Sequence, residues 1–219
     1  MEGVIFANNF KPEILDKKVL YDLFAGLLMS ARSIRRFEGD REVGFDVLKS
    51  LVDLTRYCSS GRNLQPLKYR IVADRCEALR VYPLLKWAGY LPEWDGPEEC
   101  ERPTAYLVQC LDTRLSSSCL CDDGLQLQAI TLGATALGLS CCIIKAFNSP
   151  KLAEVLELEE WAEPRYVVAI GYPKEEVRIV ETNGELGADI KYYRDAAGVH
   201  YVPKRRLQEL LISTKSKNQ

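Results

Sequence analysis

The chain has 219 residues, of which 47% are hydrophobic and 27% charged, and its formal net charge is -2. This composition is typical of a soluble globular protein and excludes an intrinsically disordered one. A nearly neutral chain has no overall field that would attract nucleic acid or an acidic membrane, so neither is an expected partner. The length favours a single domain, residues 1–219, around one core.

No bilayer-spanning helix and no secretion signal are predicted. The long apolar stretch over residues 125–139 is interrupted by Gln126, Gln128 and Thr131. The first ten residues lack a basic start followed by an apolar run, which argues against secretion. We therefore expect a cytoplasmic protein.

The eight cysteines and the single histidine limit the chemistry that the chain can perform. The spacings Cys119-x-Cys121 and Cys141-Cys142 are not those of a zinc ribbon, and His200 is remote from both, so no metal site is expected. A nucleophile system with a histidine base would need His200, which disfavours most hydrolases. We interpret the cysteines as reduced, buried or half-buried thiols.

The N-terminal half alternates helical patterns with irregular tracts. Residues 1–17 have no clear periodicity and are interpreted as an arm that ends near Asp16, a candidate helix cap. Apolar and β-branched patterns predict helices over residues 19–28, 45–57 and 76–85 and a strand over residues 69–72. The proline- and glycine-rich tract 89–103 is the expected mobile or substrate-facing segment.

The C-terminal half contains the strongest helical pattern, over residues 122–137. Small residues such as Gly133 and Ala134 lie among its leucines and isoleucines, which predicts a buried central helix that another helix approaches closely. The remaining predictions are strands over 105–110, 141–144 and 166–170, helices over 150–156 and 207–212, and a frayed tail over 213–219. Together these patterns predict an α+β fold with three α/β/α layers.

Two basic clusters stand out against the neutral background. The first is formed by Arg32, Arg35 and Arg36 and the second by Lys204, Arg205 and Arg206. If they meet in space, they form a site for a phosphate dianion, to which Ser33 adds a hydroxyl group. The alternative is that both clusters are ordinary solvated surface charge.

The loop over residues 59–66 is dense in hydroxyl and amide groups, with the sequence Ser-Ser-Gly-Arg-Asn-Leu-Gln-Pro. Such groups suit hydrogen bonding to a heteroaromatic edge such as a flavin pyrimidine. The same composition also describes an ordinary turn.

Five separated motifs follow one another along the chain: Arg32-Ser33-Ile34-Arg35-Arg36-Phe37, the loop 59–66, the helix and strand from Asp122 to Cys142, Ala169-Ile170-Gly171-Tyr172-Pro173, and Val202-Pro203-Lys204-Arg205. In this order they resemble the nitroreductase family of FMN-dependent oxidoreductases. The resemblance implies a nitroreductase-like fold with a central mixed, mainly antiparallel sheet flanked by helices. It also implies a homodimer in which the two subunits share their domains and hold FMN at their interface.

Site residues can be carried over from the family position by position. The resemblance places Arg32, Ser33 and Arg35 at the FMN phosphate and ribityl chain, with Lys204 and Arg205 completing the phosphate site. It places Cys141, Cys142 and Ile143 beside the isoalloxazine ring. It implies that a loop reaches the flavin from the partner subunit, through Ser59, Ser60, Asn63 and Gln65.

The sequence departs from the family pattern at some of these positions. Ala31 stands where the family often has an arginine, which removes one phosphate cation, and Arg36 is a candidate to compensate. Cys58 stands where a proline is frequent. A tryptophan that is often found at the position of Leu67 or Cys142 is missing.

The function that the resemblance implies is ping-pong hydride transfer from NADH or NADPH, through FMN, to a nitroaromatic, quinone, flavin or similar small acceptor. The chemistry would take place on the flavin, so no catalytic side chain is assigned. Alternatives are a non-catalytic flavin-binding or thiol-based redox-sensing protein, and another reaction of the same fold such as flavin reduction or reductive dehalogenation.

Overall fold

A computed structural model gives the fold of this protein and describes residues 16–185 and 187–212. The tail expected over residues 213–219 and nearly all of the arm expected over residues 1–17 lie outside the described residues. The predicted cap at Asp16 is confirmed, because its carboxylate accepts the backbone N–H groups of Lys18 and Val19 at the start of the first helix.

The helices and strands follow the sequence patterns closely in the first 171 residues. The helices are α1 (Lys17–Ser30), α2 (Phe45–Leu54), α3 (Arg75–Val81), α4 (Asp122–Ala136), α5 (Ser149–Val155) and α6 (Leu207–Leu210). The strands are β1 (Leu67–Val72), β2 (Ala105–Asp112), β3 (Ser140–Ile144), β4 (Ala162–Gly171), β5 (Val177–Glu181), β6 (Tyr193–Arg194) and β7 (His200–Lys204). Short 3-10 turns continue α2 and α3, where longer helices were predicted.

The strands form two sheets. The central sheet has the order β1-β2-β4-β3 and is antiparallel throughout. The one parallel pairing at this sheet among the described residues is an isolated bridge between Ser33 and Cys141 at the β3 edge. The smaller sheet has the order β5-β7-β6, with β7 parallel to β5 and antiparallel to β6.

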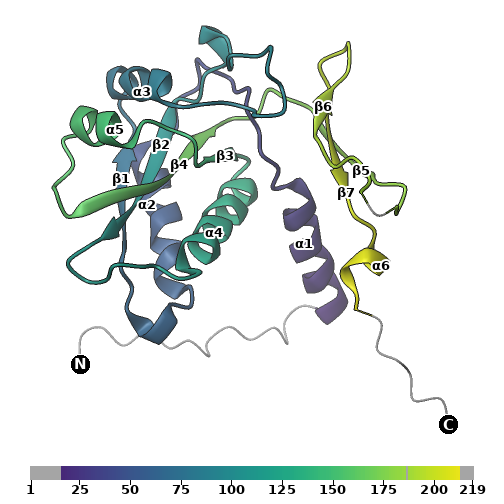
Figure 1. Ribbon diagram of the computed structural model, residues 1–219, viewed down its shortest axis with the longest axis horizontal. Coiled ribbons are helices and arrows are strands. Elements are labelled where there is room, and N and C mark those ends of the chain that lie inside the picture. The colour runs from purple at the N-terminus through teal and green to yellow at the C-terminus, as the bar shows by residue number, and fades with distance from the viewer. Residues whose placement is uncertain (1–15, 186, 213–219) are drawn as a thin grey trace.

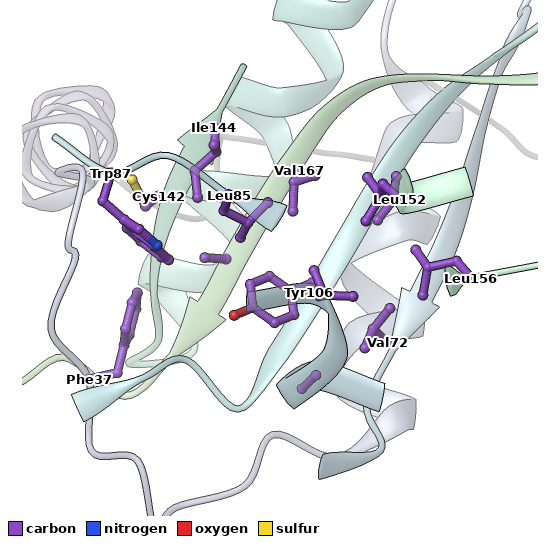
Figure 2. Packing of buried hydrophobic residues seen from close by; sticks show 14 of the residues in the cluster. Phe37, Val72, Leu85, Trp87, Tyr106, Cys142, Ile144, Leu152, Leu156 and Val167 are labelled. Carbon is purple, nitrogen blue, oxygen red and sulfur yellow. The ribbon is translucent and has the colours of Figure 1, made fainter. Parts of the chain in front are cut away.

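Helices cover both faces of the central sheet, which gives the predicted three layers. Helices α3 and α5 cover one face and α2 and α4 the other, as Figure 1 shows. Figure 2 shows the first of these two packed faces, where Tyr106 of β2, Val167 of β4 and Leu152 of α5 are fully buried. Burying aliphatic and aromatic side chains on both faces of one sheet is the main source of stability for such a fold. The α+β fold class is therefore confirmed.

The close helix approach predicted along α4 is also confirmed. A Cβ atom added at Gly133 would lie 2.4 Å from the Leu54 side chain and 3.1 Å from that of Leu51, both on α2. Because no side chain intervenes, α2 packs directly against the α4 backbone. This contact fixes α4, whose middle turns line the cavity described below.

Two regions outside the layered body were not fully predicted. The small sheet was missed, apart from the basic motif on β7, and the last helix is shorter than the predicted span of 207–212. Helix α1 has no buried residue and stands at the margin of the body, on the side from which the small sheet extends (Figure 1).

Candidate functional site

A cavity of about 320 Å³ lies where α1, α4, β3 and the small sheet meet. Its lining residues come from four segments that are far apart in the sequence. They are Ala31, Arg32, Ser33, Arg35, Gln128, Thr131, Cys141, Ile143, Tyr192, His200, Val202 and Lys204. None of these is acidic and three are cationic, so the cavity favours an anionic or electron-rich ligand.

The segment that follows α1 runs along the edge of β3 and carries the first basic cluster. The backbone N–H of Ile34 donates to the Cys141 carbonyl at 3.0 Å, which completes the bridge at Ser33. Arg32 donates through Nη2 to the Leu28 carbonyl at 2.7 Å, while its Nε is buried and has no partner among the described residues. An unsatisfied buried donor beside a cavity suits an oxyanion ligand.

The second basic cluster reaches the cavity through one residue only. Lys204, at the end of β7, lines the cavity and forms no ion pair within residues 16–185 and 187–212. Arg205 instead pairs with Glu209 at 3.3 Å, and Arg206 donates to the Thr182 carbonyl at 3.0 Å. The fold thus brings Lys204 to Arg32 and Ser33, while Arg205 lies outside the cavity lining.

The cation missing at Ala31 is not replaced by Arg36. The Arg36 guanidinium forms a bidentate pair with Glu101, at 2.6 and 2.8 Å, and does not line the cavity. This pair lowers the pKa of Glu101, mainly through the Arg36 hydrogen bonds. Arg36 therefore fastens the segment after α1 to the turn before β2.

A buried charged cluster backs the cavity. The Glu175 carboxylate, whose side chain is 0% exposed, accepts the backbone N–H of Arg35 at 2.9 Å and pairs with the Arg194 guanidinium. The Arg35 side chain contacts other residues, with Nη1 3.2 Å from His200 Nε2 and its guanidinium 4.6 Å from the centre of the Tyr192 ring. Burial lowers the pKa of His200 to about 4, although the neighbouring Glu175 opposes this shift.

Aromatic contacts join this cluster to the irregular tract 89–103. The Tyr90 and Tyr192 ring centres are 5.0 Å apart, and the Tyr90 backbone N–H donates to the Tyr192 hydroxyl at 3.2 Å. Further along the same two segments, the Arg194 guanidinium lies 4.1 Å from the centre of the Trp94 ring. An aromatic pair is worth about 0.5–1.5 kcal/mol and an exposed cation–π contact about 0.5–1 kcal/mol, so together they hold the tract beside the cavity.

Strand β3 presents alternate side chains to the cavity and to the core. Cys141 and the 40% exposed Ile143, which the resemblance places beside a flavin ring, both line the cavity. Cys142 lies on the opposite face, within the packed cluster of Figure 2, so its side chain does not line the cavity. The period of two along a strand is the physical reason.

The buried thiols are poor nucleophiles. Burial raises the pKa of Cys110 to about 12 and that of Cys142 to about 11, and it raises the pKa of Cys141 further. A thiolate is the species that reacts, so these pKa values disfavour thiol redox chemistry at the three sites.

The loop 59–66 lies at the N-terminal end of α4, away from this chain's own cavity. Ser60 donates to Asp122 at 2.6 Å and accepts the Gln65 backbone N–H at 2.9 Å. Asn63 and Gln65 have φ values of 55° and 49°, a left-handed conformation that costs energy for residues other than glycine. With Ser59, they are solvent-exposed on this chain, and none of the four predicted loop residues lines the cavity.

Some cavity residues were not predicted from the sequence, namely Gln128, Thr131 and Tyr192, and His200 was considered only as a possible base. A signal existed for the first two, because polar residues three apart on an apolar helix share one face. No comparable signal marked Tyr192 or His200, since the small sheet that carries them was missed.

The antiparallel sheet, its two helical layers and the cavity at the β3 edge define the nitroreductase fold. The nitroreductase family model matches residues 121–172, which run from the start of α4 to the end of β4. The resemblance deduced from the sequence motifs is therefore confirmed.

Solved structures share this fold at low sequence identity. An FMN-dependent nitroreductase from Clostridium difficile R20291 is 21% identical, with a TM-score of 0.58, and the alignment covers 69% of this chain and 88% of that one. A protein from Parabacteroides distasonis described as an NADH dehydrogenase/NAD(P)H nitroreductase is 22% identical, with a TM-score of 0.58 and 70% and 89% coverage. A nitroreductase-like protein from Streptococcus mutans is 14% identical, with a TM-score of 0.60 and 71% and 91% coverage.

No curated protein matches the chain significantly. In the part of the chain that the structure describes, no helix has the length and apolar character needed to cross a bilayer. The same residues contain no cluster of three or more histidine, cysteine or acidic side chains arranged to hold a metal ion.

Proposed function

We propose that this chain is an FMN-dependent oxidoreductase that takes a hydride from NADH or NADPH and passes it to a small acceptor, such as a nitroaromatic compound, a quinone or a flavin. The observation that carries the proposal is the cavity, because Arg32, Ser33 and Arg35 line it together with Lys204, which lies 169 positions beyond Arg35 in the sequence. These are residues at which the family resemblance places FMN.

The phosphate end of the ligand would lie against Arg32, Ser33 and Lys204. Arg32 offers a buried Nε without a protein partner, and Lys204 offers an ammonium group that no carboxylate of the described residues neutralises. Charge-assisted hydrogen bonds from such groups are the usual way in which proteins hold a phosphate dianion. The donor set therefore fits the phosphorylated cofactor.

The ring end would lie along β3, beside Ile143 and Cys141, with Gln128 and Thr131 of α4 opposite. FMN, when bound, would supply the hydride chemistry. The chain's own tasks are to anchor the phosphate, orient the ring and exclude water, which agrees with the lack of an exposed histidine base.

Two comparisons support this assignment. The Clostridium difficile protein of the same fold is described as FMN-dependent, and the Parabacteroides distasonis protein is described as acting with NAD(P)H. Thiol-based redox sensing, the alternative considered from the sequence, receives less support because burial raises the pKa values of Cys141 and Cys142.

We propose further that the functional unit is a homodimer. Helix α1 exposes a row of apolar side chains, including Tyr21 at 67% and Met29 at 62%, which is unusual for a helix that faces only water. A second copy would cover this surface. Its loop, with Ser59, Ser60, Asn63 and Gln65, would then be available to complete the cofactor site of this chain.

The cofactor is tested by the absorption spectrum of the purified protein and by fluorescence titration of the apoprotein with FMN. Replacing Arg32 or Lys204 by alanine should weaken FMN binding by about 1.5–3 kcal/mol each, the contribution of a hydrogen bond to a charged group. This corresponds to a change in Kd of about 10- to 150-fold. Arg178→Ala, which removes an exposed cation paired with Glu176, is the matched control.

The reaction is tested by steady-state oxidation of NADH and NADPH with quinone and nitroaromatic acceptors. Turnover that depends on bound FMN supports the proposal. Bound flavin without turnover with any acceptor would favour a non-catalytic flavoprotein instead. If the purified protein does not bind FMN, the proposal is refuted.

The assembly is tested by sedimentation equilibrium of the wild type and of Leu23→Glu on α1, where Leu23 is 58% exposed. We expect a dimer that the substitution dissociates, with loss of FMN, whereas a monomeric wild type would refute the dimer.

The cytoplasmic location stays a prediction that cell fractionation can test.

A further inference from the structure

The Arg35 guanidinium is buried beside the cavity without a carboxylate of its own. The residue is only 8% exposed, and its Nη1 donates to the Ser33 carbonyl at 3.4 Å and to His200 Nε2 at 3.2 Å. The nearby Glu175 carboxylate is occupied by the Arg35 backbone N–H and by the Arg194 side chain. Arg35, Arg194 and Glu175 together therefore carry two positive charges and one negative charge, and the charge without a paired carboxylate is that of Arg35, which lines the cavity.

The state of His200 follows from its contact with Arg35. Arginine has only donors, so His200 Nε2 must accept, and the neutral ring then carries its proton on Nδ1. Burial favours this neutral form and lowers the pKa of His200 to about 4. His200 Nδ1 is buried and has no hydrogen-bond partner among the described residues. Among the described residues, Arg35 is therefore the only hydrogen-bond partner of the imidazole ring.

The small sheet fixes the imidazole in this position. The His200 backbone N–H donates to the Glu176 carbonyl at 2.9 Å, and His200 pairs with Val177 in the parallel β5–β7 ladder. The Tyr192 ring lies 5.1 Å from the imidazole and packs on the same guanidinium. A neutral acceptor and an aromatic face orient a guanidinium without neutralising it.

We infer that His200 is a positioning residue, which holds the Arg35 guanidinium at the cavity so that its uncompensated charge meets the electron-rich part of the bound cofactor. The inference rests on the proposed function, because it takes FMN as the ligand. It assigns a task to the small sheet, which carries His200 on β7 and Tyr192 directly before β6.

The test is a double-mutant cycle measured by FMN fluorescence titration of the apoprotein. The single variants are His200→Phe, which removes the acceptor but keeps a ring, and Arg35→Gln, which removes the charge. We expect each single variant to bind FMN at least about 10-fold more weakly than the wild type. Because the two residues act together, the double variant should have no lower FMN affinity than the single variant with the lower affinity. His200→Gln should bind within about 3-fold of the wild type, because its amide oxygen restores an acceptor.

Tyr201→Phe is the matched control on β7, since the Tyr201 hydroxyl contacts only Asp195 in the described hydrogen bonds. Thermal unfolding of each apoprotein checks that the variants fold, and His200→Met replaces His200→Phe if the latter does not. Additive losses in the cycle, or failure of His200→Gln to recover binding, would mean that His200 is merely structural and would overturn the inference.

The outcomes separate this inference from the proposed function. A wild type that takes up FMN while His200→Phe binds it equally well overturns the positioning role alone. A wild type that takes up no FMN overturns both.

Discussion

Replacing Glu175 with glutamine tests the buried cluster behind the cavity. The substitution keeps the shape and one acceptor oxygen but removes the negative charge that faces Arg194. Because the Glu175 side chain is 0% exposed and that of Arg194 only 15% exposed, water can do little to compensate the guanidinium. Breaking a buried ion pair by removing one partner costs about 3–5 kcal/mol.

We expect the lower end of this range, about 3 kcal/mol, because the Arg194 guanidinium keeps its contact with the Trp94 ring. For a chain of this size, that loss lowers Tm by about 6–12 °C. Urea and thermal unfolding followed by circular dichroism measure both quantities. The control is Glu176→Gln, since the neighbouring Glu176 is 57% exposed and its pair with Arg178 should contribute less than about 1 kcal/mol.

The double variant Glu175→Gln/Arg194→Gln sharpens the test. Removing both charges should recover part of the loss, because no uncompensated guanidinium then stays buried. If Glu175→Gln alone lowers the free energy of unfolding by less than about 1 kcal/mol, as the surface control should, the electrostatic reasoning is refuted.

Three further predictions concern the layers and the thiols. Gly133→Val should destabilise the protein by about 1–3 kcal/mol in urea unfolding, because its Cβ would overlap the Leu54 side chain, and an unchanged midpoint would contradict the close packing of α2 on α4. The Arg36 hydrogen bonds lower the pKa of Glu101, so the stability that they add is present above the unfolded-state pKa and is lost as the pH falls through the lower folded-state pKa. The difference in free energy of unfolding between wild type and Glu101→Gln should therefore shrink from pH 6 to about pH 3. A difference that stays constant over this range would argue against the pair. Cys142 should react with iodoacetamide at pH 8 only on unfolding, because burial raises its pKa to about 11, whereas rapid labelling of the folded protein would show that the site is open.

The layered body could be predicted because its sequence signals are local. The spacing of apolar residues located α2 and α4, and β-branched runs located β3 and β4, since each element buries one continuous face. The glycine at position 133 even indicated which helix would be approached closely. Their hydrogen bonds and core contacts then follow from the same pattern.

The cavity could be predicted only in part, because its geometry depends on contacts between distant segments. The basic motifs located Arg32 and Lys204, but charge alone could not distinguish Lys204 from Arg205, which pairs with Glu209 instead. The β-strand period placed Cys142 in the core, although the family resemblance had grouped it with Cys141. Motif matching identifies segments, whereas side-chain direction decides which members of a segment reach the ligand.

His200 and Tyr192 were missed because the small sheet has weak local signals. Its strands are short and polar, and β7 contains Pro203, a residue that usually argues against a strand within a sheet. These strands are fixed by Glu175 and by the aromatic contacts to the tract 89–103, none of which a local pattern reveals.

The paired contacts of Tyr90 with Tyr192 and of Trp94 with Arg194 also constrain how this fold can be altered. A designer who grafts a different tract 89–103 from another protein removes two of the supports of the small sheet at the same time. The two segments should therefore be exchanged as a matched pair, and chimaeras that swap only one of them should lose ligand binding even when the grafted tract never touches the ligand.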